Sequence, residues 1–156
     1  MAELHAGFHL RPMVSDDLPE VCEIENAAQP TPWSTAVFQD CLNSRYQCDV
    51  VERDGQLVAF LVVSRVLDEA HLLNIVVAPG FQRRGLAWAM LKQLHAQCRG
   101  AGTSMVYLEV RASNLAAQAL YQKLGYQESG RRRDYYRTVG GREDAVLMTL
   151  ALELRP

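Results

Sequence analysis

The 156-residue chain has little net charge and no long hydrophobic run. Its formal net charge of −2 argues against a surface that binds nucleic acid generally. No apolar stretch approaches the roughly 18 residues that a membrane span needs, and the N-terminus lacks the basic start and apolar core of a secretion signal. We therefore expect a cytoplasmic protein whose partners include neither nucleic acid nor membrane.

The cysteines are few and form no metal-binding pattern. None of the four, Cys22, Cys41, Cys48 and Cys98, belongs to a C-x-x-C pair, and none alternates with histidine as a zinc site requires. The sequence predicts no metal site and free thiols in a reducing compartment. Cys98 has no basic or capping neighbour that would lower its pKa, so we do not expect a nucleophile there.

Repeats, low-complexity segments and linker-like stretches are also absent. With 49% hydrophobic residues, the chain is long enough for one buried core and too short for two ordinary domains. We expect a single domain over residues 1–156.

The first half of the chain predicts a strand, two helices and an antiparallel meander. A strand at 8–13 is followed by a helix that starts at Ser15 and runs to about residue 27. Ser34 is positioned to cap a second helix, whose apolar face would carry Val37, Phe38, Cys41 and Leu42. Asp54-Gly55 then joins two β-rich runs within 48–66, and a third run at 71–77 completes the meander.

The second half predicts a crossover. After Gly85, apolar residues at helical spacing lead to a strand at 104–110. Because a helix joins them, this strand and the one at 71–77 should lie parallel in one sheet, with a right-handed connection. Asn114 would cap a further helix that ends at Gly125, and a strand near 126–132, a polar loop and a last strand at 145–154 follow. The fold class is mixed α/β.

The turn "QRRGLA" at 82–87 lies between a predicted strand and a predicted helix. At a helix N-terminus, unpaired N–H groups and a partial positive charge favour a phosphate group. Gly85 permits close approach of the backbone, and Arg83 and Arg84 add positive charge. Taken alone, such a turn is more often a solvated basic turn than a ligand site. The dinucleotide and P-loop fingerprints are both absent.

With its single glycine and its final alanine, this turn resembles the acetyl-coenzyme A motif of the GNAT superfamily of N-acetyltransferases. The segments "PWS" (32–34), "LDEAHLLNIVVAP" (67–79), "LEVRASNLAAQALYQKLGY" (108–126), "RRDYY" (132–136) and "GREDAVLM" (141–148) are similar to the RimI-type ribosomal-protein alanine N-acetyltransferases of bacteria. This resemblance covers nearly the whole chain from about residue 8. It implies a GNAT-like fold, in which the two central parallel strands split apart.

The resemblance also implies a set of site residues. Acetyl-coenzyme A would be bound by the backbone of Ile75, Val76 and Val77 at the pantetheine, by Arg83, Arg84, Gly85, Leu86, Ala87 and Trp88 at the pyrophosphate, and by Asn114. Glu109 would be the general base and Tyr121 the general acid. A backbone N–H near Val77 would stabilise the oxyanion, and no metal would be needed.

The same residues have ordinary structural interpretations. Glu109 on a strand is commonly a solvated edge residue, Tyr121 lies on the apolar stripe of its helix, and Asn114 is explained as a helix cap. The resemblance favours the catalytic interpretation of Glu109 and Tyr121. His71 and His95 fit a strand and a helix surface, and neither suggests a catalytic triad.

On the acceptor side, the loop at Trp33 would form one wall of a peptide groove, and the loop over 131–144 the other. Tyr135 and Tyr136 would bracket the acceptor N-terminus. Loop carboxylates at Asp68, Glu69, Glu143 and Asp144 could supply negative charge for an acceptor with arginine in its second position, although most such carboxylates are merely solvated.

We therefore expect an enzyme that acetylates the α-amine of an N-terminal alanine. The expected acceptor is the Ala-Arg start of a small-subunit ribosomal protein. Two alternatives are a GNAT enzyme that acts on a small-molecule amine and a non-catalytic regulator that binds acetyl-coenzyme A. A monomer is the favoured oligomeric state.

Overall fold

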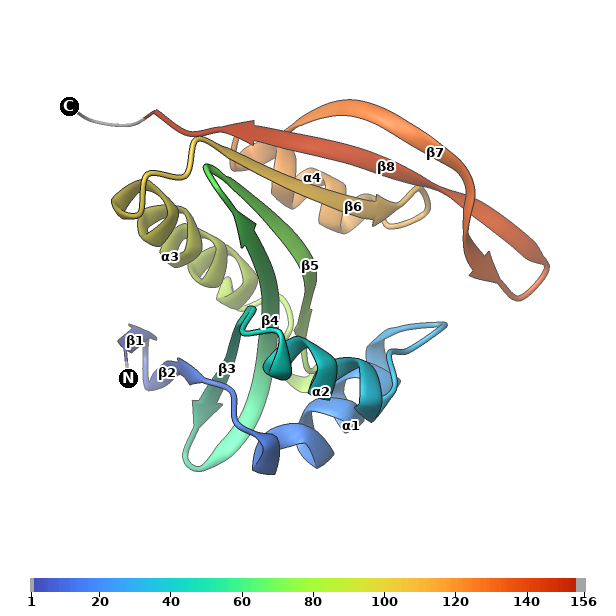
Figure 1. Cartoon of the computed structure of the whole chain (residues 1–156). Coiled ribbons are helices and arrows are strands. Elements are labelled where there is room, and N and C mark those ends of the chain that lie inside the picture. Colours follow the sequence, from blue (N-terminus) through green and yellow to red (C-terminus); the bar gives the residue numbers. More distant parts are fainter. Residues whose placement is uncertain (1, 154–156) are drawn as a thin grey trace. The chain divides into compact units, whose positions relative to one another are not determined.

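The computed structural model describes residues 2–153, apart from the side chains of residues 2, 3 and 5. In chain order the elements are β1 (Ala2–His5), β2 (Phe8–Pro12), η1 (Ser15–Asp17), α1 (Leu18–Ala28), α2 (Thr35–Asn43), β3 (Gln47–Arg53), β4 (Gln56–Val66), β5 (Glu69–Val77), η2 (Pro79–Phe81), α3 (Leu86–Gly100), β6 (Met105–Arg111), α4 (Leu115–Lys123), β7 (Gln127–Thr138) and β8 (Gly141–Ala151). The mixed α/β class is confirmed (Figure 1). None of the helices in the described residues is both long and apolar enough to cross a membrane.

The chain forms two compact units. One contains the residues up to 64 together with 73–94, and the other contains 65–72 and 95 to the C-terminal end. The chain passes between them inside β4, β5 and α3. The expectation of a single domain stays a prediction.

The first unit holds strands in the order β1-β2-β3-β4-β5. β3 and β4 pair antiparallel up to Arg53 and Gln56, and Asp54 and Gly55 between them have φ of 52° and 78°. A type I′ hairpin turn has positive φ at both of its central residues, so this is the turn that the Asp-Gly pair predicts. β1, which was not predicted from the sequence, pairs with β2 at the edge.

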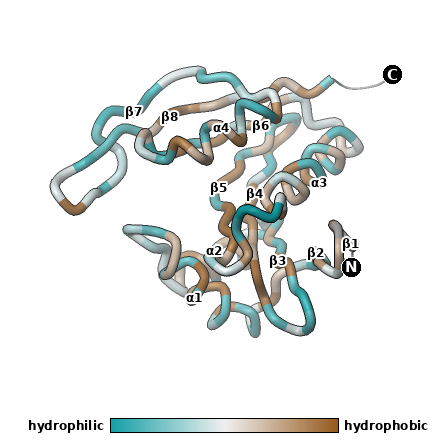
Figure 2. The backbone as a smooth tube through the Cα atoms, turned by 180° about the vertical axis from the view of Figure 1, so that it is seen from behind, coloured by the Kyte–Doolittle hydropathy of each residue, from teal (hydrophilic) through white to brown (hydrophobic). Residues whose placement is uncertain are grey.

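The core of the first unit lies between α1, α2 and the strands. Its buried side chains are Met13, Leu18, Val21, Ile24, Phe38, Cys41, Cys48, Val50, Leu57, Phe60, Val62 and Val76. Figure 2 shows the matching hydrophobic colouring along β4. Ser34 caps α2 as expected, because its Oγ accepts from the Val37 N–H at 3.3 Å. Val37 itself is exposed, so the predicted apolar face of α2 was wrong at its edge.

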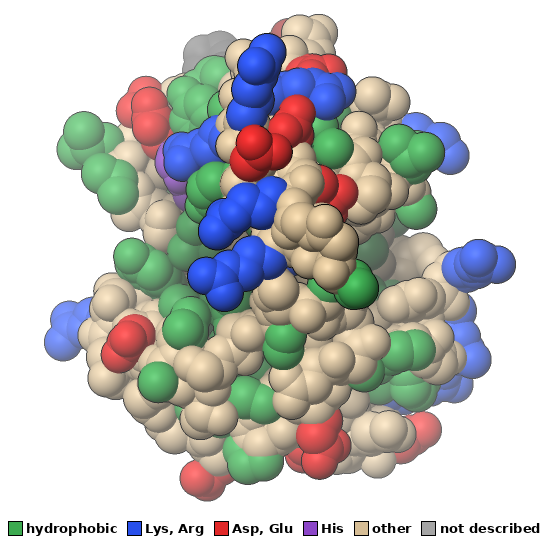
Figure 3. Space-filling model, turned by 90° about the vertical axis from the view of Figure 1, so that its right-hand side faces the viewer, with side chains coloured by type: hydrophobic (Ala, Val, Ile, Leu, Met, Phe, Trp, Pro, Cys, Tyr) green, Lys and Arg blue, Asp and Glu red, His purple; other side chains and the backbone are tan. Residues whose placement is uncertain are grey.

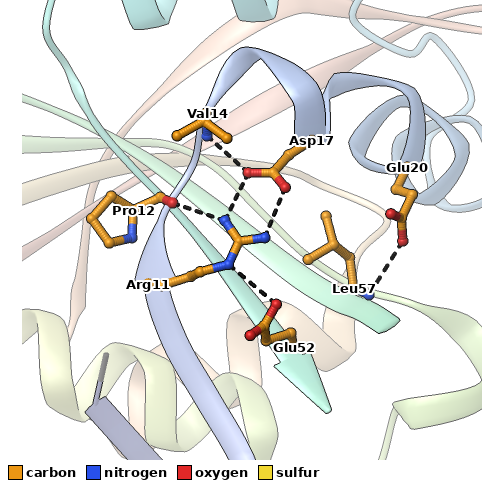
Figure 4. A network of polar contacts seen from close by, with 7 residues as sticks. All are labelled: Arg11, Pro12, Val14, Asp17, Glu20, Glu52 and Leu57. Carbon is orange, nitrogen blue, oxygen red and sulfur yellow. Dashed lines mark hydrogen bonds and ion pairs between the residues drawn. The ribbon is translucent and has the colours of Figure 1, made fainter. Parts of the chain in front are cut away.

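Arg11 fixes the start of α1 through a polar network (Figure 4). Its guanidinium donates to both carboxylate oxygens of Asp17, at 2.9 and 2.8 Å, and to Glu52 at 3.2 Å. Asp17 also accepts from the Val14 N–H at 2.8 Å. The hydrogen bonds from Arg11, which have the largest effect, and from the Val14 N–H hold the pKa of Asp17 below its ordinary value. The network therefore stabilises the fold as long as Asp17 is ionised.

Asp17→Asn is expected to lower the free energy of unfolding at pH 7 by about 2 kcal/mol, because a charge-assisted pair is lost. Since the folded pKa of Asp17 is depressed, its contribution is complete above the unfolded value of about 3.9 and is lost as the pH falls through the folded pKa. Thermal unfolding of both proteins from pH 7 down to pH 2.5 measures this. A difference between them that stays constant over that range would contradict it.

The second unit holds the order β5-β6-β8-β7. β5 and β6 run parallel, as predicted, from Glu69↔Met105 to Leu72↔Leu108. Beyond that point Glu109, Val110 and Arg111 continue to pair with β8. The ladder between the two parallel strands thus ends halfway, which is the split that the resemblance implied. Asn114 caps α4, since Oδ1 accepts from the Ala117 N–H at 3.1 Å, and Gly125 follows with φ of 101°.

The polar loop expected after residue 132 is instead the outer half of a β-hairpin. β7 continues to Thr138 and β8 begins at Gly141, with pairs such as Tyr136↔Glu143 beyond a bulge after Arg132. The segment lacks the alternation of apolar and polar residues that signals a strand, and its backbone is ordered by pairing with β8 instead. Figure 3 shows basic and acidic side chains gathered in a strip on the face turned toward the viewer.

Candidate active site

The turn before α3 presents its backbone as an anion-binding cradle would. Gly85 has φ of 75°, and nothing lies within 4 Å of the position that a Cβ there would take. Its carbonyl accepts the first helical bond, from Ala89 at 3.0 Å, which leaves the N–H groups just inside α3 without intrahelical acceptors. The turn is also tied to β5, because Gln82 Nε2 donates to the Val77 carbonyl at 3.0 Å. Sequence reasoning missed this role of Gln82.

The predicted cofactor residues of the first unit gather around this turn. Arg83 and Arg84 are exposed, with the Arg84 guanidinium 5.3 Å from the Phe81 ring centre. Leu86 is buried, so only its backbone can serve a ligand, while Trp88 is partly exposed beside Lys92. Ile75, Val76 and Val77 form the end of β5 directly before the turn. Ala87 lies in the first turn of α3.

Glu109 lies in the second unit, on β6, directly after the last residue of that strand that pairs with β5. Its carboxylate forms an ion pair with Arg132 of β7 at 3.3 Å, and its side chain is 29% exposed. The Arg132 side chain is 55% exposed and also lies 5.3 Å from the Tyr135 ring centre. An ion pair this open to solvent is worth only about 0–1 kcal/mol, so Glu109 can exchange this partner for a ligand.

Tyr136 interacts electrostatically both with Glu109 and with Tyr121. Burial, and then the negative charge of Glu109, raise the pKa of Tyr136 to about 12. Burial, and then Tyr136, raise the pKa of Tyr121 to about 12. A phenol with so high a pKa is protonated at neutral pH. The second unit therefore holds the predicted base, the predicted acid and one predicted acceptor residue, Tyr136, which interacts with the other two.

Arg111 fixes the hairpin beside these residues, a role that the sequence did not suggest. Its guanidinium lies 4.5 Å from the Tyr136 ring centre and donates to the Arg137 carbonyl at 2.8 Å and to Glu143 at 3.1 Å. Hydrogen bonds from Ser113, together with Arg111, lower the pKa of Glu143. Glu143 is thus engaged inside the protein, which argues against its expected role toward an acceptor arginine.

The other predicted residues divide between the two units. Trp33, in the first unit, packs its ring 5.3 Å from that of Phe38. Tyr135, in the second, is exposed and meets Tyr136 edge-on at 5.0 Å. Asn114 is exposed at the start of α4, so its capping role leaves it accessible to a ligand.

His95 was wrongly assigned to a helix surface. It is 3% exposed, and its Nε2 lies 2.7 Å from the Tyr126 hydroxyl. The helical spacing of Leu91, His95 and Cys98 does place His95 on the buried face of α3, but it could not name the partner, which lies 31 residues later in the chain. Burial raises the pKa of Cys98, as expected of an inert thiol. Within the described residues, no group of three or more His, Cys, Asp or Glu side chains could hold a metal ion.

Comparison with known proteins identifies the family of the chain. The model of the acetyltransferase (GNAT) family matches residues 16–126, which is more than half of the chain. The chain belongs to the GNAT family. The resemblance drawn from its motifs is confirmed, and with it the activity class of an N-acetyltransferase; acetyl-coenzyme A is the donor that this family uses.

Within the GNAT family, the chain is similar to enzymes named for one ribosomal protein. It is 44% identical over 138 residues to the [ribosomal protein bS18]-alanine N-acetyltransferase of Escherichia coli, covering 88% of this chain and 93% of the relative. The enzyme of the same name from Haemophilus ducreyi is 37% identical over 90% of this chain and 97% of its own. The crystal structure of the E. coli ribosomal-protein-S18-alanine N-acetyltransferase superposes with a TM-score of 0.90 at 40% identity and covers 96% of both chains. The roles of the individual site residues stay predictions.

Proposed function

We propose that this GNAT enzyme transfers the acetyl group of acetyl-coenzyme A to the α-amine of an N-terminal alanine on a small-subunit ribosomal protein. The observation that carries this proposal is the 44% identity, over nearly the full length of both chains, to an enzyme named for the alanine of ribosomal protein bS18. Glu109, a partly exposed carboxylate, and Tyr121, a phenol that is protonated at neutral pH, support it as a candidate base and a candidate acid.

The residues before α3 fit the pyrophosphate of the donor. The open space at Gly85 lets a phosphate reach the backbone, and the N–H groups at the helix start supply donors and partial positive charge. Arg83 and Arg84 add cationic side chains on the exposed side of the turn. Acetyl-coenzyme A, when bound, supplies an acetyl group activated as a thioester.

Glu109 then acts on the acceptor amine. An α-amine has a pKa of about 7.7–8.0, so most of it is protonated at pH 7 and cannot attack a carbonyl. Glu109 accepts the proton, directly or through a water molecule, and the neutral amine attacks the acetyl carbon. A backbone N–H near Val77 stabilises the charge that develops on the acetyl oxygen. Tyr121 gives its proton to the departing sulfur. The second proton, which the nitrogen loses as the amide forms, restores the Tyr121 phenol through solvent.

The test is acetylation of a synthetic peptide that begins Ala-Arg, read as a gain of one acetyl group by intact mass. The control is the same peptide with its α-amine already blocked, which should gain nothing. An unblocked peptide that stays unchanged after prolonged incubation with enzyme and acetyl-coenzyme A would overturn the proposed acceptor.

Tyr121→Phe is expected to lower kcat by about tenfold, at or below the lower end of the range for acid catalysis. The effect is limited because an alkyl thiol has a pKa of about 8.5, so the departing thiolate needs little help near neutral pH. The KM for acetyl-coenzyme A should hardly change. Steady-state kinetics at pH 7.5 measure both constants, with Tyr46→Phe, an exposed tyrosine of the first unit, as the control. Full activity in Tyr121→Phe would remove the acid role.

A further inference from the structure

A buried carboxylate lies on the apolar face of α1. Glu25 is 1% exposed and follows Leu18, Val21 and Ile24 along the buried side of the helix. Burying a carboxylate is costly unless hydrogen-bond donors surround it. Glu25 is supplied with such donors from outside its own helix, and they come from two other segments of the first unit.

The donors belong to the loop before α2 and to β5. The Trp33 backbone N–H donates to Glu25 Oε2 at 2.9 Å. Asn74, a buried amide within the apolar run of β5, donates from Nδ2 to both carboxylate oxygens, at 3.2 and 3.3 Å. Gln29 Nε2 approaches Asn74 Oδ1 at 3.5 Å. We call this set of hydrogen bonds the Glu25 clamp.

The Glu25 clamp holds both ends of the short loop over residues 29–33. At one end, Gln29 bonds to Glu25 through its backbone N–H at 2.9 Å and reaches Asn74 through its side chain. At the other end, the Trp33 N–H is bound and its ring packs on Phe38. Pro30, Thr31 and Pro32 remain exposed between these two anchors.

The Glu25 clamp includes Asn74 of β5, which directly precedes the residues predicted to bind the cofactor. Asn74 precedes Ile75, Val76 and Val77, the segment assigned to the pantetheine, and Ala78 continues the strand by donating to the Val58 carbonyl at 2.8 Å. A change in the Glu25 clamp would therefore move the loop relative to the end of β5. Both segments belong to the first unit, so this relation is internal to it.

We propose that Glu25 and Asn74 are positioning residues for acceptor binding, which hold the 29–33 loop at a set place against the end of β5. The inference rests on the proposed function, because it takes this loop as a wall of the acceptor groove. Neither residue touches the reacting atoms in this proposal. Their effect is on the affinity for the acceptor, through the loop that they hold.

The experiment uses a reciprocal exchange of donor and acceptor. Asn74→Asp places a second carboxylate against Glu25 and is expected to raise the acceptor KM by about tenfold or more, and the isosteric Glu25→Gln by about threefold. In the double variant Glu25→Gln/Asn74→Asp, the glutamine NH2 can donate to the new carboxylate at position 74 while its carbonyl accepts from Trp33. The acceptor KM should then return to within about twofold of wild type. If Asn74→Asp does not fold, the comparison of Glu25→Gln with the double variant decides.

The KM for the acceptor distinguishes a displaced loop from a loss of folded enzyme. A variant that is merely destabilised has less folded enzyme, which lowers the apparent kcat but leaves KM for both substrates unchanged. Asp17→Asn is the matched control, because it weakens the other polar network of α1 without touching the loop, and it should lower Tm with no change in KM. Hydrogen exchange at the Trp33 amide, measured without substrate, should speed up in Asn74→Asp and return to wild type in the double variant.

Two results would count against the inference. An acceptor KM that is unchanged in Glu25→Gln and Asn74→Asp, with a wild-type enzyme that acetylates the peptide, would overturn the inference alone. A wild-type enzyme that acetylates no N-terminal peptide would overturn the proposed function and this inference with it.

Discussion

Glu109→Gln is expected to lower kcat/KM for the acceptor peptide at pH 7 by about a hundredfold or more, the range typical of a lost general base. The substitution keeps the shape of the side chain and a hydrogen-bond acceptor, but the amide cannot take a proton. It also removes the ion pair with Arg132, which is too exposed to account for an effect of this size. Initial rates at saturating acetyl-coenzyme A measure the change.

The pH dependence distinguishes a missing base from a damaged site. As the pH rises past the amine pKa of about 8, a growing share of the acceptor is neutral without help, so the deficit of Glu109→Gln should shrink. Glu128→Gln is the matched control, since Glu128 is an exposed carboxylate paired with Arg131 on the same hairpin. A deficit of the same size at pH 7 and pH 9.5 would contradict a base role for Glu109.

The parts of the fold that were predicted correctly are those with local signals. Asp54-Gly55 requires two left-handed residues in succession, and the hairpin between β3 and β4 has them. Ser34 and Asn114 offer side-chain oxygens at helix starts, and both accept the expected N–H. The turn at Gly85 likewise combines a left-handed glycine with the start of α3. Each of these features is decided within a few residues of chain.

The features that were missed depend on partners far away in the sequence. β7 is ordered beyond Arg132 by pairing with β8, although its side chains show no alternation of apolar and polar residues. The buried His95 has its hydrogen-bond partner, Tyr126, 31 residues later in the chain. Asn74 joins Glu25 across 49 positions. Glu25 and Asn74 are polar residues within otherwise apolar segments of the sequence. That pattern indicates that their side chains are buried, but it does not show which residue each one bonds to.

The candidate site was predicted mainly through the resemblance. Composition and spacing alone left Glu109 as a strand edge residue and Tyr121 as a core aromatic. The structure adds what neither source contained, namely that Arg132 meets the carboxylate of Glu109 and that Arg111 holds Tyr136. Both arginines act on residues that are distant in the sequence, so no local pattern could assign them.

Gly85→Val is expected to raise the KM for acetyl-coenzyme A by about thirtyfold or more. A Cβ at this position would meet no atom within 4 Å, so the cost that we expect lies in the backbone. At φ of 75° a β-branched residue is a genuine outlier, because left-handed backbone alone costs about 1–2 kcal/mol for a residue with a Cβ. The turn would relax to negative φ and carry the N–H groups at the start of α3 out of their arrangement. Titration of acetyl-coenzyme A in initial-rate assays gives the KM.

Ala87→Gly provides the contrasting result two residues later. Ala87 lies inside α3, where glycine is accepted sterically and costs up to about 1 kcal/mol of helix stability. The KM should stay within about twofold of wild type even if Tm falls slightly. This asymmetry follows if Gly85 is the one glycine that the turn needs and Ala87 is an ordinary helical residue. If the two variants raised the KM for acetyl-coenzyme A equally, the left-handed backbone at Gly85 would not be the feature that decides binding.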